Sequence, residues 1–389
     1  MLPLKKLTVA FCVAMSSFQA ATPGWASNVE EVAPDVERLR RLVIQSEILG
    51  EARPVDIYLP KSYGATAEAH PVIYVLDGEE SFHYAAGVLD ALYQRGYPKM
   101  ILAAIPNRNR SLDLTPEAWG SDALSGGGAD NFAAFFAEEL IPAVDARFRT
   151  QQYRVLVGHS FGGLFASHVL ATRPDIFDSY IAISPSMDFA DHRPLKTLEK
   201  SFANDAARPK SLFVAMGNEP GGEGDSVHQL YSMLAVGAPS WLDWAFHRFP
   251  DEDHSSVPVI AMLQGLRFVF QDFVIEGRDI PATARSLEQH YQEVSERFAW
   301  VVKPPQRVLM NLGYGQLERG EADAAVDTFK LYAKLYPDQI AGWDGLSAAY
   351  QLQGDEKASI AALRKVIEIA PWYDEARLKL EALEQNIKD

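Results

Sequence analysis

A serine flanked by glycines has the residue types and spacing that nucleophilic catalysis requires. Gly158-His159-Ser160-Phe161-Gly162 matches G-x-S-x-G, directly follows the apolar run Tyr153–Val157 and opens a helical stretch. A strand, a tight turn and a helix in this order form a nucleophile elbow, which projects the serine Oγ from strained backbone. We expect side chains in place of Gly158 and Gly162 to collide with the neighbouring strand and helix. Ser160 is therefore the predicted nucleophile.

A serine nucleophile needs a base, and α/β-hydrolases supply it in the chain order Ser, acid, His. His254 lies in the polar loop that follows the last strand-like run, Trp244–Phe249. His159 is inside the motif and His168 lies two turns into the next helix, so neither can present its ring to Ser160 as required. His254 is the predicted general base.

The acid that orients the histidine should follow the strand-like run Ser211–Met216. Glu219 is the first candidate there and Asp225 is the second. A Ser–His dyad without an acid stays open as a third possibility. In all three cases the chemistry is acyl transfer through a covalent intermediate on the serine.

Two backbone N–H groups should stabilise the oxyanion that forms during attack. Phe161 begins the helix after the nucleophile. The second donor should come from the backbone around Asp77-Gly78-Glu79, after the run Pro71–Leu76, and Gly78 is the residue chosen there. We predict these two residues as the oxyanion hole. The chain has no HExxH motif, no Walker A motif and no dinucleotide fingerprint after its first buried strand. The one cysteine, Cys12, lies in the N-terminal segment 1–26, so the rest of the chain has no thiolate metal site. Together with the missing motifs, this predicts neither a metal nor a cofactor.

The elements that position these residues alternate between strand and helix. The first two strand-like runs form a hairpin around Gly50-Glu51, and helical stretches such as Asn131–Phe148 and Gly162–Thr172 separate most of the others. This pattern predicts an α/β fold, a doubly wound and mostly parallel α/β-hydrolase sheet. The predicted strands are Arg41–Leu49, Pro54–Leu59, Pro71–Leu76, Met100–Ile105, Tyr153–Val157, Ser179–Ile183, Ser211–Met216 and Trp244–Phe249.

From about Thr283 the pattern becomes continuous helix and contains a repeat. Similar residues recur 34 positions apart, which is the tetratricopeptide period. We predict that the α/β domain is followed by an all-α, tetratricopeptide-like helical module. The recurring pairs are Gly320 and Gly354, Phe329 and Leu363, Pro337 and Pro371, and Leu312 and Leu346.

Two repeats are too few to bury a continuous core alone. We therefore expect the module to pack on the hydrolase domain or on another chain, such as a protein partner or a second copy in a homodimer. We also expect Trp300, Tyr314 and Trp343 to line or cap the substrate entrance. The apolar stripe expected to make the contact is formed by Leu287, Tyr291, Val294 and Phe298.

The N-terminus has the features of a secretory signal. Lys5 and Lys6 precede the apolar run Leu7–Phe18, and small residues at Gly24 and Ala26 suit a cleavage site. The predicted organisation is a signal peptide at 1–26, an esterase domain at 27–280 and the helical module at 281–389. This predicts a periplasmic or secreted protein with no membrane insertion after the signal is removed.

The overall charge restricts the partners. The formal net charge of −16 argues against nucleic acid and anionic membranes, which require a basic surface. We expect a small-molecule ester as the substrate.

Several segments together resemble the putative esterase family, which includes enterochelin-type siderophore esterases, feruloyl esterases, esterase D and mycolyltransferases. The resemblance covers about residues 38–275 and is most specific in the runs 158–163 and 253–258. It implies ester hydrolysis with Ser160 and His254 as nucleophile and base. Family members differ in the acid, and a secreted subgroup has a C-terminal tetratricopeptide-like tail. The resemblance does not select a substrate.

Two other functions stay open at this point. One is a binding or scaffold protein that acts through the helical module, and the other is an acyltransferase on the same scaffold. The intact motif around Ser160 favours the enzyme, because an idle site has no need of a strained turn.

Overall fold

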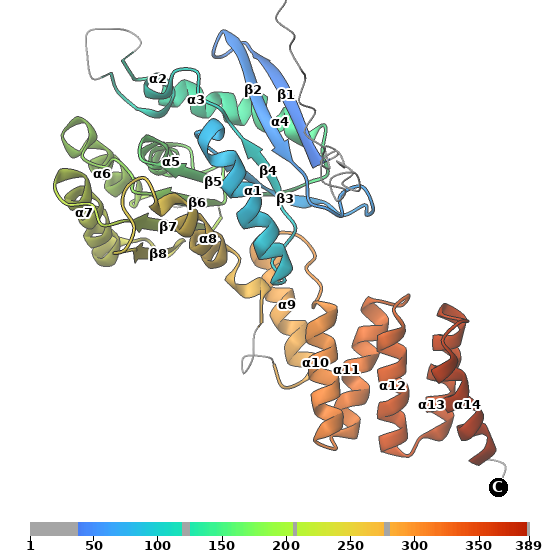
Figure 1. Ribbon diagram of the computed structural model, residues 1–389. Helices are drawn as coiled ribbons and strands as arrows, with labels where there is room; N and C mark the ends of the chain where they lie inside the picture. The colour runs from blue at the N-terminus through green and yellow to red at the C-terminus, as the bar shows by residue number, and fades with distance from the viewer. Residues whose placement is uncertain (1–37, 119–124, 205–207, 276–280, 387–389) are drawn as a thin grey trace, which may run out of the picture. The chain divides into compact units, whose positions relative to one another are not determined.

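The computed structural model describes residues 38–118, 125–204, 208–275 and 281–386 (Figure 1). The predicted signal peptide, residues 1–26, lies outside these residues and stays a prediction. Within the described ranges, no helix combines the length and apolar character needed to cross a bilayer.

The described strands form one eight-stranded sheet in the order β1-β2-β4-β3-β5-β6-β7-β8. β1 pairs antiparallel with β2, β2 pairs antiparallel with β4, and the other neighbours are parallel. Every predicted strand is present, which confirms a mixed, mostly parallel α/β sheet. The strands are β1 (Leu39–Ser46), β2 (Glu51–Tyr58), β3 (His70–Val75), β4 (Ile101–Ala104), β5 (Thr150–His159), β6 (Ser179–Ile183), β7 (Lys210–Met216) and β8 (Leu242–Arg248).

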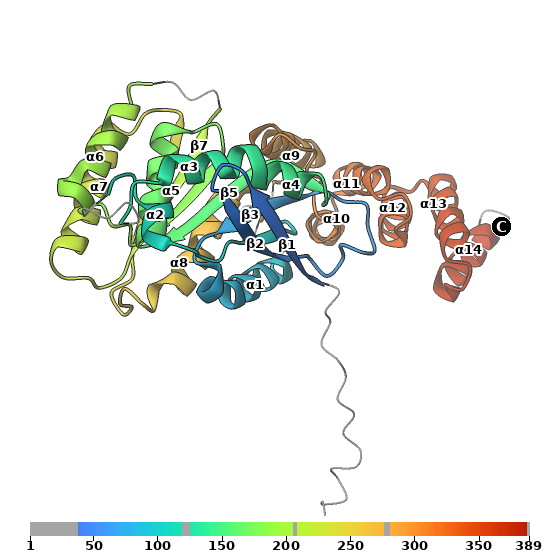
Figure 2. The ribbon, with the colours of Figure 1, turned by 90° about the horizontal axis from the view of Figure 1, so that it is seen from above.

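Helices cover both faces of this sheet, so most residues of its central strands are apolar and buried. Ile73 and Val75 of β3 face one core, while Val72 and Tyr74 face the other. Figure 2 shows α1 and α8 on one side of the sheet and α3 and α5 on the other. The helices of this part are α1 (Gly78–Gln94), α2 (Arg110–Leu114), α3 (Ala129–Phe135), α4 (Ile141–Asp145), α5 (Phe161–Thr172), α6 (Phe189–Ser201), α7 (Gly222–Gly237) and α8 (Val257–Val269).

The helix predicted over residues 131–148 is interrupted. A π-helical turn, Phe136–Leu140, separates α3 from α4, and Pro142 lies in the first turn of α4, where its missing N–H is tolerated. Within the π-helical turn, Glu139 accepts hydrogen bonds from the backbone N–H groups of Glu47 at 2.8 Å and Ile48 at 3.2 Å. The interruption thus ties this segment to the β1–β2 hairpin.

The described secondary structure of the C-terminal region is all helical, and from the helix that begins at Gln306 onward consecutive helices pack on one another. Gly320 and Gly354, one of the pairs 34 positions apart, both have left-handed backbone with φ of 72° and 84°. Gly345 and Phe329 lie on consecutive helices. A Cβ on Gly345 would lie 2.1 Å from the Phe329 ring, so these two helices approach closely. The helices are α9 (Ala284–Phe298), α10 (Gln306–Glu318), α11 (Ala322–Leu335), α12 (Ile340–Gln353), α13 (Glu356–Ile369) and α14 (Asp374–Asn386).

The apolar stripe of α9 packs on the α/β region, as predicted. The Phe298 ring centroid lies 4.7 Å from that of Tyr153 in β5 and 5.5 Å from that of Phe270, which follows α8. Removal of the helices would expose this aromatic surface to solvent. The four stripe residues, Leu287, Tyr291, Val294 and Phe298, are each at most 2% exposed.

Candidate active site

Ser160 occupies the turn between β5 and α5 with strained backbone, at φ 59° and ψ −116°. A Cβ on Gly158 would lie 2.1 Å from the carbonyl oxygen of Gly162, so only glycine fits at position 158. A Cβ on Gly162 would lie 3.4 Å from its nearest neighbours, which is ordinary contact. The predicted collision at Gly162 is therefore wrong. The tight position after the serine is Gly163, whose Cβ would lie 2.9 Å from Pro185 Cα.

His254 lies in the loop between β8 and α8, and it shares a cavity of about 560 Å³ with Ser160. Its ring centroid lies 4.5 Å from that of His159, which also lines the cavity. The Ser160 Oγ lies 3.4 Å from the Oγ of Ser186. The structure thus brings the predicted nucleophile and the predicted base to one cavity at the carboxyl ends of the parallel strands.

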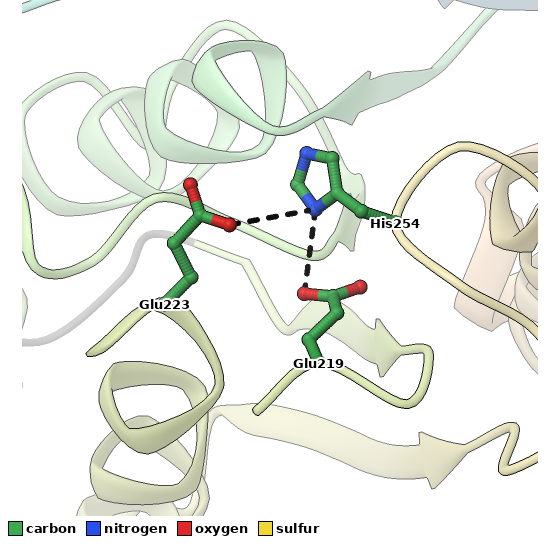
Figure 3. A group of neighbouring side chains, drawn as sticks. All are labelled: Glu219, Glu223 and His254. Atoms are coloured by element: carbon green, nitrogen blue, oxygen red, sulfur yellow. Dashed lines mark ion pairs between the residues drawn. The ribbon is translucent and has the colours of Figure 1, made fainter. Parts of the chain in front are cut away.

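Glu219 lies in the loop between β7 and α7 and faces His254 (Figure 3). The distance from Glu219 Oε2 to His254 Nδ1 is 3.4 Å. The other oxygen, Oε1, accepts hydrogen bonds from Ser184 Oγ at 2.5 Å and from the Gly217 N–H at 3.1 Å. Asp225, the second candidate, is exposed on α7. The structure therefore brings Glu219 to His254.

A second carboxylate, which the sequence analysis missed, also faces His254. Glu223 Oε2 lies 3.9 Å from His254 Nδ1 (Figure 3). Glu223 follows Glu219 by four positions across a glycine turn, and no periodic pattern signals that contact. One group of described side chains is close enough to hold a metal ion. It consists of Glu219, Glu223 and His254, whose potential ligand atoms all lie within 4.8 Å of one another.

The surroundings shift the protonation of these groups. The contact with Glu219 raises the pKa of His254, although burial opposes this. Burial alone would raise the pKa of Glu219, but its interactions with His254, Ser184 and the Gly217 N–H outweigh burial and lower that pKa. Burial, together with the nearby His254, lowers the pKa of His159 to about 4. At neutral pH Glu219 is therefore ionised and His159 is neutral.

The raised pKa of His254 predicts a particular pH dependence. A general base must be neutral to accept a proton, so kcat/KM for an uncharged ester should fall as His254 becomes protonated on acidification. Glu223 contributes to the raised pKa of His254. Glu223→Gln should therefore move the acid midpoint of the kcat/KM profile to lower pH. The same change at an exposed glutamate remote from the cavity, Glu356→Gln, is the control, and an unchanged midpoint in Glu223→Gln would contradict the prediction.

The predicted oxyanion donor Gly78 is engaged elsewhere. Its N–H donates a hydrogen bond to the Ile105 carbonyl oxygen at 2.9 Å, so this donor does not face the cavity and the expectation is wrong. The cause lies in Asp77, whose left-handed backbone (φ 54°, ψ 48°) directs the next N–H toward the end of β4. Asp77 itself lines the cavity. Phe161 is the first residue of α5, directly after Ser160.

Arg110 connects the two loops beside the nucleophile. Its Nε donates to Asp77 Oδ1 at 2.7 Å, and one terminal nitrogen donates to Asp77 Oδ2 and to the His159 carbonyl oxygen, each at 3.1 Å. Asn107 Nδ2 also donates to Asp77 Oδ1, at 2.6 Å. The sequence analysis did not identify Arg110, because residues 77, 110 and 159 are far apart in the chain.

The three aromatic residues expected at the substrate entrance are elsewhere. Trp300 packs on Tyr153 near the start of β5, with ring centroids 5.8 Å apart, whereas Ser160 follows the end of that strand. Neither Tyr314 nor Trp343 is among the described residues that line the cavity. The expectation that these rings cap the entrance is wrong, because α9 anchors the helices near the start of β5, whereas the cavity lies beyond its end.

Comparison with known proteins identifies the family. A family model described as "Putative esterase" matches residues 46–234. The chain is 28% identical over 248 residues to the ferri-bacillibactin esterase BesA of Bacillus subtilis, covering 56% of this chain and 85% of the relative. It is 29% identical over 272 residues to the siderophore enterobactin esterase of Emericella nidulans, covering 55% and 88%.

A solved structure extends the likeness into the helical region. The IroE-like serine hydrolase from Shewanella oneidensis superposes with a TM-score of 0.66 at 32% identity, covering 76% of this chain and 99% of that one. Its fold therefore agrees with an α/β sheet followed by helices. The chain belongs to the putative esterase family and is an enzyme of the carboxylic-ester hydrolase class.

Proposed function

We propose that the enzyme hydrolyses small-molecule esters through an acyl-enzyme on Ser160, with His254 as general base and Glu219 as the acid that orients it. The single observation that carries this proposal is the arrangement of three groups. Ser160, on a strained turn, and His254 line one cavity. Glu219 Oε2 lies 3.4 Å from Nδ1 of His254. These are the residue types of a Ser–His–acid triad, with the nucleophile and the base in one cavity and the acid beside the base.

The proposed reaction has two symmetrical halves. Ser160 Oγ attacks the ester carbonyl while His254 Nε2 takes its proton, and the imidazolium then gives that proton to the departing alcohol. Water repeats the sequence on the acyl-enzyme and regenerates the serine. Ionised Glu219 stabilises the imidazolium in both halves and fixes the tautomer that leaves Nε2 free to accept a proton.

The oxyanion that forms in each half needs backbone donors. We retain Phe161 for this role, because it begins α5 directly after the nucleophile and a helix N-terminus favours negative charge. For the second donor we propose the N–H of Asp77 in place of that of Gly78. Asp77 lines the cavity, and its N–H has no acceptor among the described residues.

Siderophore esters are the first substrates to test, because two relatives are named for hydrolysing them. We also propose that the protein is secreted or periplasmic, on the strength of the signal-like residues 1–26, and that the helices from residue 281 form a tetratricopeptide-like module. The left-handed glycines at positions 320 and 354, separated by the 34-residue period, support the latter.

Active-site labelling tests the proposed function. A fluorophosphonate probe phosphonylates an activated serine and should modify this protein once, at Ser160, as peptide mapping by mass spectrometry would show. Labelling should slow as His254 becomes protonated. Modification of another residue, or no modification of a protein that hydrolyses esters, would contradict the mechanism.

A further inference from the structure

The cavity around Ser160 has an unusual balance of charge. Among the described residues that line it, Arg110 is the single lysine or arginine, whereas Asp77 and Glu80 both contribute carboxylates. Arg110 donates two hydrogen bonds to the Asp77 carboxylate, and this pairing neutralises its charge. A substrate therefore meets no uncompensated guanidinium or ammonium group on the described wall of this cavity.

Glu80 has no such compensation. It is exposed in the first turn of α1, and no described lysine, arginine or histidine forms an ion pair with it. Glu80 and Tyr84 both line the cavity. Burial is the main cause that raises the pKa of Tyr84, and the negative charges of Asp77 and Glu80 add to it. Glu80 thus places an uncompensated negative charge on the α1 side of the cavity.

The residues just outside the cavity add to this potential. Glu79 accepts hydrogen bonds from the backbone and the side-chain amide of Asn107, which carry no formal charge. Two further carboxylates lie beside His254. Glu219 Oε2 is 3.4 Å and Glu223 Oε2 is 3.9 Å from His254 Nδ1. His159 contributes no positive charge at neutral pH, since its pKa is lowered to about 4. The carboxylates around Ser160 therefore exceed the cations while His254 is in the neutral form that a general base requires.

We propose that this enzyme is selective for esters that are uncharged or cationic near the scissile carbonyl, and that Glu80 is the main residue that disfavours anionic esters. The inference rests on the proposed role of Ser160. The negative charge of Glu80 repels a substrate carboxylate in the ground state. The repulsion persists in the transition state, because the oxyanion adds a further negative charge to the same cavity. Among siderophore esters, the proposed selectivity favours compounds with little negative charge over polyanionic catecholate complexes.

A matched series of esters tests this inference. The p-nitrophenyl esters of butyric acid, succinic acid as the monoester, and 4-(trimethylammonio)butyric acid have the same leaving group and a four-carbon acyl chain. They differ in carrying no charge, one negative charge and one positive charge. After subtraction of the rate without enzyme, kcat/KM for the anionic ester should be about tenfold or more below that of the uncharged ester. The cationic ester should match or exceed the uncharged one.

Two manipulations assign the effect to charge and to Glu80. Added salt should narrow the ratio between the uncharged and anionic esters, since it screens exposed charges. Glu80→Gln should narrow that ratio severalfold, whereas Glu318→Gln, an exposed glutamate on α10 outside the cavity, should leave it as in the wild type. Equal or faster hydrolysis of the anionic ester would overturn the proposal, and an unchanged ratio in Glu80→Gln would overturn the role of that residue.

The outcome is separable from that of the mechanism. If the Ser160 mechanism fails, Ser160→Ala retains the rates on all three esters, whatever their ratio. If only the charge selectivity fails, Ser160→Ala loses activity on all three esters while the wild-type enzyme treats them alike.

Discussion

Ser160→Ala is expected to abolish ester hydrolysis, with kcat reduced on the order of 10³-fold or more. The substitution removes the attacking oxygen and leaves the other groups of the cavity in position, so only the contribution of binding and of the oxyanion donors should persist. Alanine retains the Cβ that the strained turn already accommodates at φ 59°. Steady-state hydrolysis of p-nitrophenyl acetate, with circular dichroism to verify folding, measures the effect.

A neighbouring serine gives a matched control. Ser186 has its Oγ 3.4 Å from that of Ser160, yet it has no part in the proposed mechanism. Ser186→Ala should therefore cost less than about tenfold in kcat. Near-normal turnover by Ser160→Ala would refute the assignment of the nucleophile, and a larger loss in Ser186→Ala than in Ser160→Ala would transfer the role.

The second large effect is expected for Glu219→Gln, which should lower kcat by several orders of magnitude. A neutral amide cannot stabilise the imidazolium, and it favours the wrong imidazole tautomer. The change preserves size, and the amide oxygen can still accept the hydrogen bonds from Ser184 and the Gly217 N–H, so the fold should persist. Steady-state kinetics of the purified variant, with a thermal melt for stability, make the measurement.

The alternatives for the acid predict different results. If the enzyme works as a Ser–His dyad, Glu219→Gln should cost less than about tenfold. Asp225→Asn is the matched control, because Asp225 is an exposed acid in the first turn of α7. A large loss in Asp225→Asn with none in Glu219→Gln would move the assignment to Asp225.

Elements whose signal is local were predictable from the sequence. β3, β6 and β7 are buried along their whole length because helices cover both faces, and each is apolar after its first one or two residues, a run that is visible without the structure. The turn at Ser160 was predictable for the same reason, since the strand, the glycines and the helix are contiguous. His254 and Glu219 followed from chain order, because the fold delivers them after particular strands.

Features that depend on distant contacts were not predictable. Arg110 approaches Asp77 because neighbouring strands β3 and β4 end at the same edge of the sheet. The engagement of the Gly78 N–H depends on the Ile105 carbonyl, which the turn at Asp77 happens to meet. Trp300 lies near the start of β5, far from Ser160, because α9 docks there. Helical periodicity predicts which residues of a helix are buried, but it does not specify the surface against which they pack.

The backbone of Ser160 sets catalysis and thermal stability against each other at one position. A residue with a side chain at φ 59° and ψ −116° is held in a sparsely populated conformation, which costs on the order of 1–3 kcal/mol. Glycine would relieve most of that strain and would also remove the nucleophile. Selection for heat resistance alone would therefore drift toward an inert protein here, whereas selection for turnover must accept a less stable fold.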